Sequence, residues 1–184
     1  MAVLALDLIT DFDFPDGPAV RRALARQAPA IRALLAHART QRVPVIYAND
    51  NLGPWRSDSA GLIAYCMRHA GPGAELVGSL LPEPRDSIVL KPRHSAFYGS
   101  PLEMLLADRR VDTLLIAGIS AESCVWMTAC DAHTRGFQLI VPQDTMAGAL
   151  QRAVRATLTG LGEVLGARVP RHARSLRFDS GKLA

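Results

Sequence analysis

The chain has few cysteines, almost no lysine and no long uncharged apolar run, and each shortage narrows what it can be. Its three cysteines, Cys66, Cys124 and Cys130, are an odd number without a CxxC spacing, which argues against a disulfide framework and a zinc ribbon. No apolar run approaches the roughly 18 residues of a membrane span, and the apolar start lacks the basic region of a signal peptide. We therefore expect a cytoplasmic protein that does not contact a membrane.

Basic residues are unevenly distributed by type and by position. Of the 21 basic residues, only Lys91 and Lys182 are lysine; an ammonium can give up a proton where a guanidinium cannot, so Lys91 is a weak indication of chemistry. The net charge of +4 resides in the C-terminal segment 167–184, where five basic residues stand against Asp179. Because no aromatic interleaving or binding motif accompanies it, we interpret this segment as a solvated end or a subunit contact and expect no nucleic-acid partner.

The order of apolar and helical patterns predicts an α/β fold. The 184 residues are 49% hydrophobic, which predicts a single domain spanning residues 1–184. Near-continuous apolar strands that alternate with helices indicate a mostly parallel sheet, here of about six strands, covered on both faces as an α/β/α sandwich. The expected strands are Val3–Leu8, Pro44–Ala48, Asp86–Leu90, Thr113–Ala117, Gln138–Val141 and Ala167–Val169. The expected helices are Ala19–Thr40, Leu62–His69, Leu102–Leu106, Glu122–Thr134 and Ala149–Leu165, with Asn49–Ala60 and Gly71–Arg85 irregular.

Three chemically capable residues fall at the carboxyl ends of these strands, where such folds bind ligands. Asp7 ends the first strand, Lys91 follows the third, and Cys124 follows the fourth after a short turn. Asp7 could accept a proton or form a structural ion pair, and Lys91 could be an exposed residue packed on the sheet edge. From the residues alone, these alternatives remain open.

Cys124 is either a small buried hydrophobe or a nucleophile. A thiol of reference pKa about 8.5 is mostly protonated at neutral pH, so a catalytic cysteine needs help. The helix expected to begin near Glu122 and the ammonium of Lys91 would both favour the thiolate, and we expect them to lower the pKa of Cys124. Rapid alkylation at acidic pH, lost on changing Asp7 or Lys91, would then distinguish an enzyme from a non-catalytic binding domain.

Three segments resemble a known superfamily. Asp7 in "LDLITDF", Lys91 in "KPRHSAFYGSPL" and Cys124 in "AGISAESCVWMTACDA" match, in order and spacing, the signature segments of the isochorismatase-like cysteine hydrolases. That superfamily includes nicotinamidases, N-carbamoylsarcosine amidases and isochorismatases. The resemblance extends from Val3 to about Ala147, and its first segment is looser, because the family usually has Gln-Asn where this chain has Ile9-Thr10.

The resemblance implies a fold, a set of catalytic groups and an assembly. The family fold is a doubly wound α/β sandwich, and its catalytic triad would be Asp7, Lys91 and Cys124. A cis peptide is implied between Ile119 and Ser120, and it would turn the Ser120 N–H beside that of Cys124 to form an oxyanion hole. Family members associate into dimers and tetramers, so a homo-oligomer is expected.

Two departures narrow the expected reaction. Nicotinamidases bind a metal through an aspartate and two histidines after the second strand, whereas Asp50 is followed by no histidine before His69; we expect no catalytic metal and no cofactor. Isochorismatases cleave a vinyl ether without a thiol nucleophile, so a complete triad favours cleavage of a small amide or related C–N bond through a thioester. Vinyl-ether hydrolysis and a non-catalytic binding domain remain the alternatives.

A substrate pocket is expected among the loops that follow the strands. We expect its wall to use aromatic side chains and its polar contact to be an asparagine amide, although each residue could equally belong to the local core. The expected substrate-binding residues are Phe12, Asn49, Trp55, Phe97 and Tyr98.

Overall fold

The fold is built on a parallel sheet in which the first strand is central. The structure is a computed structural model that describes all residues except 52–57, 180–181 and 184. Its main sheet has five strands in the order β3-β2-β1-β4-β5, and every neighbouring pair is parallel. The sheet order reverses direction beside β1, which makes its carboxyl edge the place where such folds form a crevice. The strands are β1 (Ala2–Leu6), β2 (Val45–Asp50), β3 (Ser87–Lys91), β4 (Thr113–Gly118) and β5 (Gln138–Ile140).

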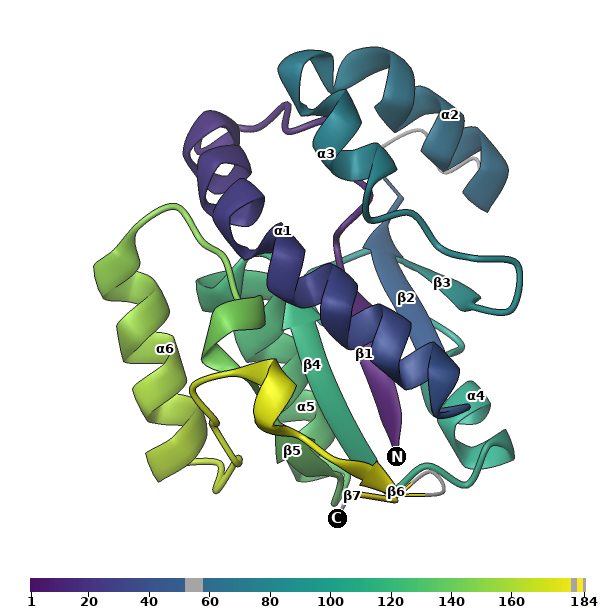
Figure 1. Cartoon of the computed structure of the whole chain (residues 1–184), viewed down its shortest axis with the longest axis vertical. Helices are drawn as coiled ribbons and strands as arrows, with labels where there is room; N and C mark the ends of the chain where they lie inside the picture. The colour runs from purple at the N-terminus through teal and green to yellow at the C-terminus, as the bar shows by residue number, and fades with distance from the viewer. Residues whose placement is uncertain (52–57, 180–181, 184) are drawn as a thin grey trace.

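Helices cover both faces of this sheet. In Figure 1, α1 crosses one face, and α4 and α5 lie behind the other. All five residues of β1 are buried, because a strand with helices on both sides has no solvent-facing side. The predicted doubly wound α/β architecture is confirmed. The helices are α1 (Gly17–Thr40), α2 (Ser59–His69), α3 (Ala74–Gly78), α4 (Leu102–Asp108), α5 (Trp126–Thr134) and α6 (Gln151–Glu163).

The expected sixth strand is reduced to one bridge. Arg168, from the expected strand Ala167–Val169, forms an isolated parallel bridge with Ile140 of β5. Its backbone accepts from Val141 N–H at 2.8 Å and donates to Leu139 at 2.9 Å. The ladder stops there because Pro170 has no N–H to donate. The main sheet therefore has five strands rather than about six.

Two segments are more ordered than the sequence suggested. The stretch Gly71–Arg85, expected to be irregular, contains α3. The C-terminal segment, expected to be a solvated end or a subunit contact, folds back on α1: the Phe178 ring stacks on His37 at a centroid distance of 4.8 Å, and Leu176 is buried. Among the helices of the described residues, none has the length and apolar character to cross a membrane.

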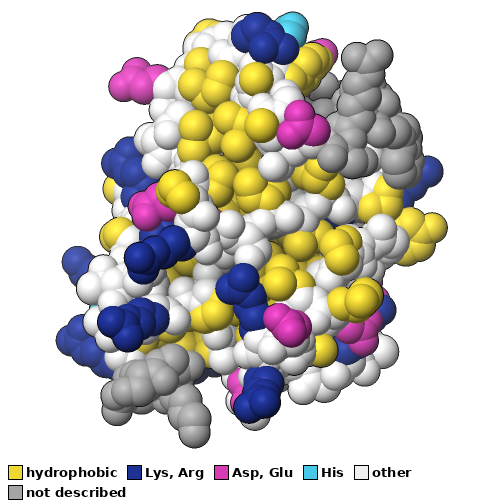
Figure 2. Space-filling view, turned by 90° about the vertical axis from the view of Figure 1, so that its right-hand side faces the viewer, with side chains coloured by type: hydrophobic (Ala, Val, Ile, Leu, Met, Phe, Trp, Pro, Cys, Tyr) yellow, Lys and Arg dark blue, Asp and Glu magenta, His cyan; other side chains and the backbone are white. Residues whose placement is uncertain are grey.

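Among the residues that the structure describes, β3 pairs with β2 and forms one edge of the sheet. Ile88 and Leu90 of this strand are half-buried, and Met104 of α4 is 77% exposed. Figure 2 looks onto this side of the molecule and shows apolar side chains spread across it.

Candidate active site

Three side chains from three strand ends meet at the carboxyl edge of the sheet. Asp7 directly follows β1, Lys91 is the last residue of β3, and Cys124 lies in the turn after β4. Because β2 separates β1 from β3, the long Lys91 side chain has to reach past the end of β2. Its Nζ lies 2.9 Å from Asp7 Oδ2 and 3.6 Å from Cys124 Sγ. The structure thus brings together the three residues that the sequence singled out.

Asp7 is held through its backbone and both carboxylate oxygens. Its φ of 50° lies in the left-handed region that few residues other than glycine adopt, and this ends β1. Oδ1 accepts the Asp50 backbone N–H at 2.8 Å. Oδ2 forms an ion pair with the Lys91 ammonium at 2.9 Å. A carboxylate oxygen has two lone pairs, so Oδ2 can still accept a further proton beside that contact.

Lys91 is fully buried and surrounded by acceptors. Besides Asp7 and Cys124, its Nζ donates to the Arg93 carbonyl at 3.3 Å and lies 4.0 Å from Asp50 Oδ2. Burial lowers the pKa of Lys91, but the Asp7 carboxylate and the Cys124 sulfur more than offset this, so the net shift of its pKa is upward. Lys91 therefore stays charged, contrary to the idea that a lysine was needed here to give up a proton.

Cys124 lies in a π-helical turn, Ala121–Val125, that leads into α5. Such turns are often found at functional sites. Burial raises the pKa of the Cys124 thiol to about 12; the nearby Asp7 carboxylate adds to this rise, and the Lys91 charge opposes it only in part. The expectation of a lowered pKa is therefore wrong for the resting site, because desolvation of a thiolate outweighs the ammonium and the helix terminus.

The raised pKa of Cys124 leads to a prediction in which reactivity and turnover change in opposite directions. Since the Asp7 carboxylate raises the pKa of the thiol, the expectation that changing Asp7 abolishes alkylation is replaced by its opposite: Asp7→Asn should increase the rate of Cys124 alkylation at mildly alkaline pH by about an order of magnitude. Turnover should be lost in the same variant, because the proton acceptor is gone. Mass-spectrometric peptide mapping can follow Cys124, with Cys130 of the same chain as the internal standard. Slower labelling in the variant would contradict this electrostatic account.

The turn between β4 and α5 has two unusual backbone features. The Ile119–Ser120 peptide bond is cis, as the resemblance implied. Gly118 has a φ of 135°, and a Cβ there would collide with the Leu6 carbonyl, so the end of β4 approaches β1 as closely as only glycine allows. Cys124 lies in the first turn of the helical segment, where N–H groups lack the usual partners within the helix.

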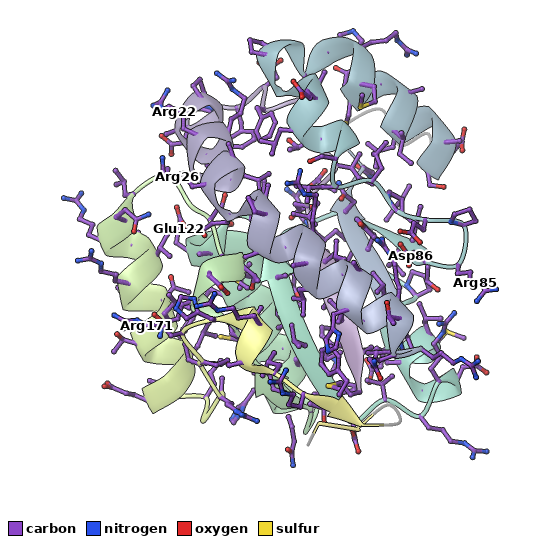
Figure 3. The ribbon with its side chains drawn as sticks, in the orientation of Figure 1. Arg22, Arg26, Arg85, Asp86, Glu122 and Arg171 are labelled. Atoms are coloured by element: carbon purple, nitrogen blue, oxygen red, sulfur yellow. The ribbon has the colours of Figure 1, made fainter. Side chains whose placement is uncertain are left out.

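A second set of contacts holds this turn in place. Ala121 N–H donates to the Ala147 carbonyl at 2.9 Å. Glu122, which lies between α1 and α6 in Figure 3, accepts from Ala149 N–H through Oε1 at 3.3 Å. The turn is thereby attached to the segment that precedes α6.

The Asn49 side chain is hydrogen-bonded to the protein backbone. It is fully buried, its Oδ1 accepts from Ile9 N–H at 3.1 Å, and its Nδ2 donates to the Ile9 carbonyl at 2.5 Å. Both ends of the amide are occupied, so Asn49 fixes the segment after Asp7. The prediction of a polar substrate contact at Asn49 does not fit this geometry.

The expected aromatic residues take different places. Phe12 is buried against Gly73 and also lines a pocket with Tyr65, a pocket that no triad residue lines. Phe97 is buried with its ring 5.8 Å from that of Phe137 and belongs to local packing. Tyr98 is 61% exposed and lines a groove with Trp126 of α5. Trp55 lies outside the described residues. Tyr98 is therefore open to a small molecule.

Asp50 is a further carboxylate beside the triad: its Oδ2 lies 4.0 Å from Lys91 Nζ, although the sequence pointed to it only as one residue of an incomplete metal site. The parallel register of β2 and β3 pairs Asp50 with Lys91, and this register is the signal that could have placed it beside the triad. In the described part of the chain, no three His, Cys, Asp or Glu side chains are grouped to hold a metal ion. The histidine-dependent donor set of nicotinamidases does not fit here, because no histidine lies between Asp50 and His69.

The chain is similar to several known proteins. A family model described as "Isochorismatase domain" matches residues 1–168. The chain is 32% identical over 168 residues to the "Uncharacterized isochorismatase family protein YaaI" of Bacillus subtilis, covering 91% of this chain and 92% of that one. It is 26% identical over 177 residues to an N-carbamoylsarcosine amidase of Arthrobacter sp., covering 90% and 66%. An N-carbamoylsarcosine amidase structure from Thermoplasma acidophilum superimposes with a TM-score of 0.71 at 26% identity, covering 92% and 95%.

Proposed function

The chain belongs to the isochorismatase family of hydrolases, and from this premise we propose that it hydrolyses a small amide or related C–N bond through a thioester on Cys124. The observation that carries the proposal is the approach of the Lys91 ammonium to both Asp7 and Cys124, at 2.9 and 3.6 Å. A carboxylate, a cation and a thiol within bonding reach are the groups that covalent hydrolysis of an acyl compound requires.

Asp7 is the proposed general base. A thiol with a pKa of about 12 is protonated at neutral pH, so the sulfur becomes nucleophilic only as its proton leaves. Asp7 interacts with both the Lys91 ammonium and the Cys124 thiol, and its carboxylate has lone pairs left beside the ion pair, so it can accept that proton. Lys91 stays charged and stabilises first the carboxylate and then the thiolate.

The proposed reaction proceeds by addition and elimination at the carbonyl carbon. The sulfur adds to the carbonyl, and the negative oxygen that forms accepts hydrogen bonds from the N–H groups of Ser120 and Cys124. Asp7 returns its proton to the leaving nitrogen, the C–N bond breaks, and an amine or ammonia departs. Water then adds to the thioester while Asp7 takes a proton from it, and Cys124 leaves as the thiol.

The reaction type is tested with a panel of small amides and carbamoyl compounds, followed by ammonia release. We expect turnover of at least one member and, after acid quenching, an acyl adduct on the peptide that contains Cys124. A vinyl ether cleaved equally well by wild type and by a variant without the thiol would instead indicate chemistry that needs no covalent intermediate.

We also propose that the enzyme acts as a cytoplasmic homo-oligomer, dimer or tetramer, without nucleic-acid or membrane partners. The apolar surface at the β3 edge, with Met104 77% exposed, supports burial against another copy (Figure 2). Light scattering coupled to size-exclusion chromatography measures the mass in solution, and a monomer at micromolar concentration would contradict this proposal.

A further inference from the structure

The segment after β3 is tied to the helix that follows Cys124. Ala96 N–H donates to Thr128 Oγ1 at 3.0 Å, and Ser95 Oγ donates to Asp131 Oδ2 at 2.5 Å. Both acceptors belong to α5, four and seven residues after Cys124. Two side chains of one helix therefore hold two consecutive residues of a segment from another strand.

A third contact extends the attachment along the same helix. Phe97 is buried, and the Arg135 guanidinium, directly after α5, lies 4.8 Å from the centre of its ring. Phe137 contacts the same ring from the start of the connection to β5. The segment therefore cannot slide along α5 without losing several contacts together.

This attachment bears directly on the catalytic cation. Lys91 Nζ donates to the Arg93 carbonyl at 3.3 Å, and Arg93 lies two residues before Ser95. The same Nζ lies 3.6 Å from Cys124 Sγ. A displacement of the segment would thus move an acceptor of the ammonium relative to the helix that carries the sulfur.

Thr128 is the buried member of this attachment. It has no exposed surface, and its oxygen serves a backbone N–H of a different segment. Thr134 of the same helix behaves in the ordinary way for a helical threonine, since its hydroxyl donates to the Cys130 carbonyl one turn earlier at 2.9 Å. The two residues share a helix and a chemistry but differ in whether they link to the Lys91 segment.

We propose that Thr128, assisted by Ser95, is a positioning residue that sets the distance between the Lys91 ammonium and the Cys124 sulfur. The triad residues come from separate strands and are precise only if their supporting contacts are rigid. Thr128 touches neither the reacting atoms nor the substrate in this proposal; it acts through the segment that holds Lys91.

The test compares Thr128→Val with Thr128→Ser and with the matched change Thr134→Val. Valine keeps the volume but removes the acceptor of the Ala96 N–H. Because the Lys91 charge lowers the pKa of the thiol, its displacement should slow Cys124 alkylation at mildly alkaline pH by about tenfold, the effect of one pKa unit. We expect kcat to fall while KM stays within about twofold. Thr128→Ser and Thr134→Val should both keep wild-type labelling and turnover.

The proposal is overturned if a folded Thr128→Val chain labels and turns over like wild type. It is also overturned if Thr128→Ser is as impaired as Thr128→Val, since volume rather than the acceptor would then matter. Should Thr128→Val not fold, Ser95→Ala takes its place, with a smaller decrease in both rates expected and an unchanged rate counting against the proposal. The turnover measurement rests on the proposed function, whereas the labelling needs no substrate, so the two can fail separately.

Discussion

Replacing Cys124 by alanine should lower kcat by at least about 10⁴-fold and leave the chain folded. The sulfur is the atom beside both the Lys91 ammonium and the Asp7 carboxylate, and alanine offers no lone pair to attack a carbonyl. The expected decrease in kcat is large because the triad acts as a unit: without the thiol, Asp7 has no nucleophile to deprotonate. Steady-state ammonia release and a thermal melt on the same preparation measure both parts of the prediction.

Cys130→Ala is the matched control for this experiment. Cys130 is half-buried on α5 and lies next to Asp131 rather than beside the triad. The same atomic change there lies in the groove lined by Tyr98 but removes no group of the triad, so turnover should stay within about twofold of wild type. Amide turnover that persists in Cys124→Ala would contradict the thioester mechanism, whatever the result for Cys130→Ala.

Replacing Lys91 by methionine should damage both activity and stability. Lys91 is fully buried and lies 2.9 Å from Asp7, whose side chain is 12% exposed. Removing Lys91 leaves the Asp7 carboxylate buried without its partner. Breaking a buried ion pair in this way costs about 3–5 kcal/mol of unfolding free energy. Turnover should fall on the order of 10³-fold, because no cation remains to stabilise the thiolate. Urea denaturation and kcat/KM measure the two effects.

A double variant separates the two effects of Lys91. When Asp7→Asn is added to Lys91→Met, the unpaired carboxylate becomes a neutral amide, and most of the lost stability should return. Activity should stay absent, because both the base and the cation are missing. A double variant that is no more stable than Lys91→Met would show that the loss arises from packing of the lysine stem rather than from the unpaired charge.

Alternation of apolar runs with helical patterns is enough to predict the layered architecture, because a strand buried on both faces needs apolar residues at nearly every position. The pattern predicted Val3–Leu8 and Thr113–Ala117 within two residues of their observed ends. The same signal failed at Ala167–Val169, where apolar character is present but Pro170 ends the ladder after one bridge. It also missed α3, which is too short for a helical period to be visible.

Residue type and position, supported by the family resemblance, were sufficient to single out Asp7, Lys91 and Cys124, since parallel strands bring their carboxyl ends to one edge. The same reasoning could not assign Asn49. An asparagine near the end of a strand gives the same sequence pattern whether it binds a substrate or, as here, the Ile9 backbone. Nor could it foresee that the pKa of Cys124 is raised rather than lowered.

What the sequence determined by itself is therefore the order of elements and the identity of the chemical groups. Only the tertiary structure decided how those groups affect one another. It set which carboxylate pairs with Lys91 and how deeply the Cys124 sulfur is buried. It also joined the segment after β3 to α5 through Thr128. The reason is physical. Periodicity and residue chemistry are local properties of the chain, whereas desolvation and charge interaction depend on distances between segments that lie far apart along it.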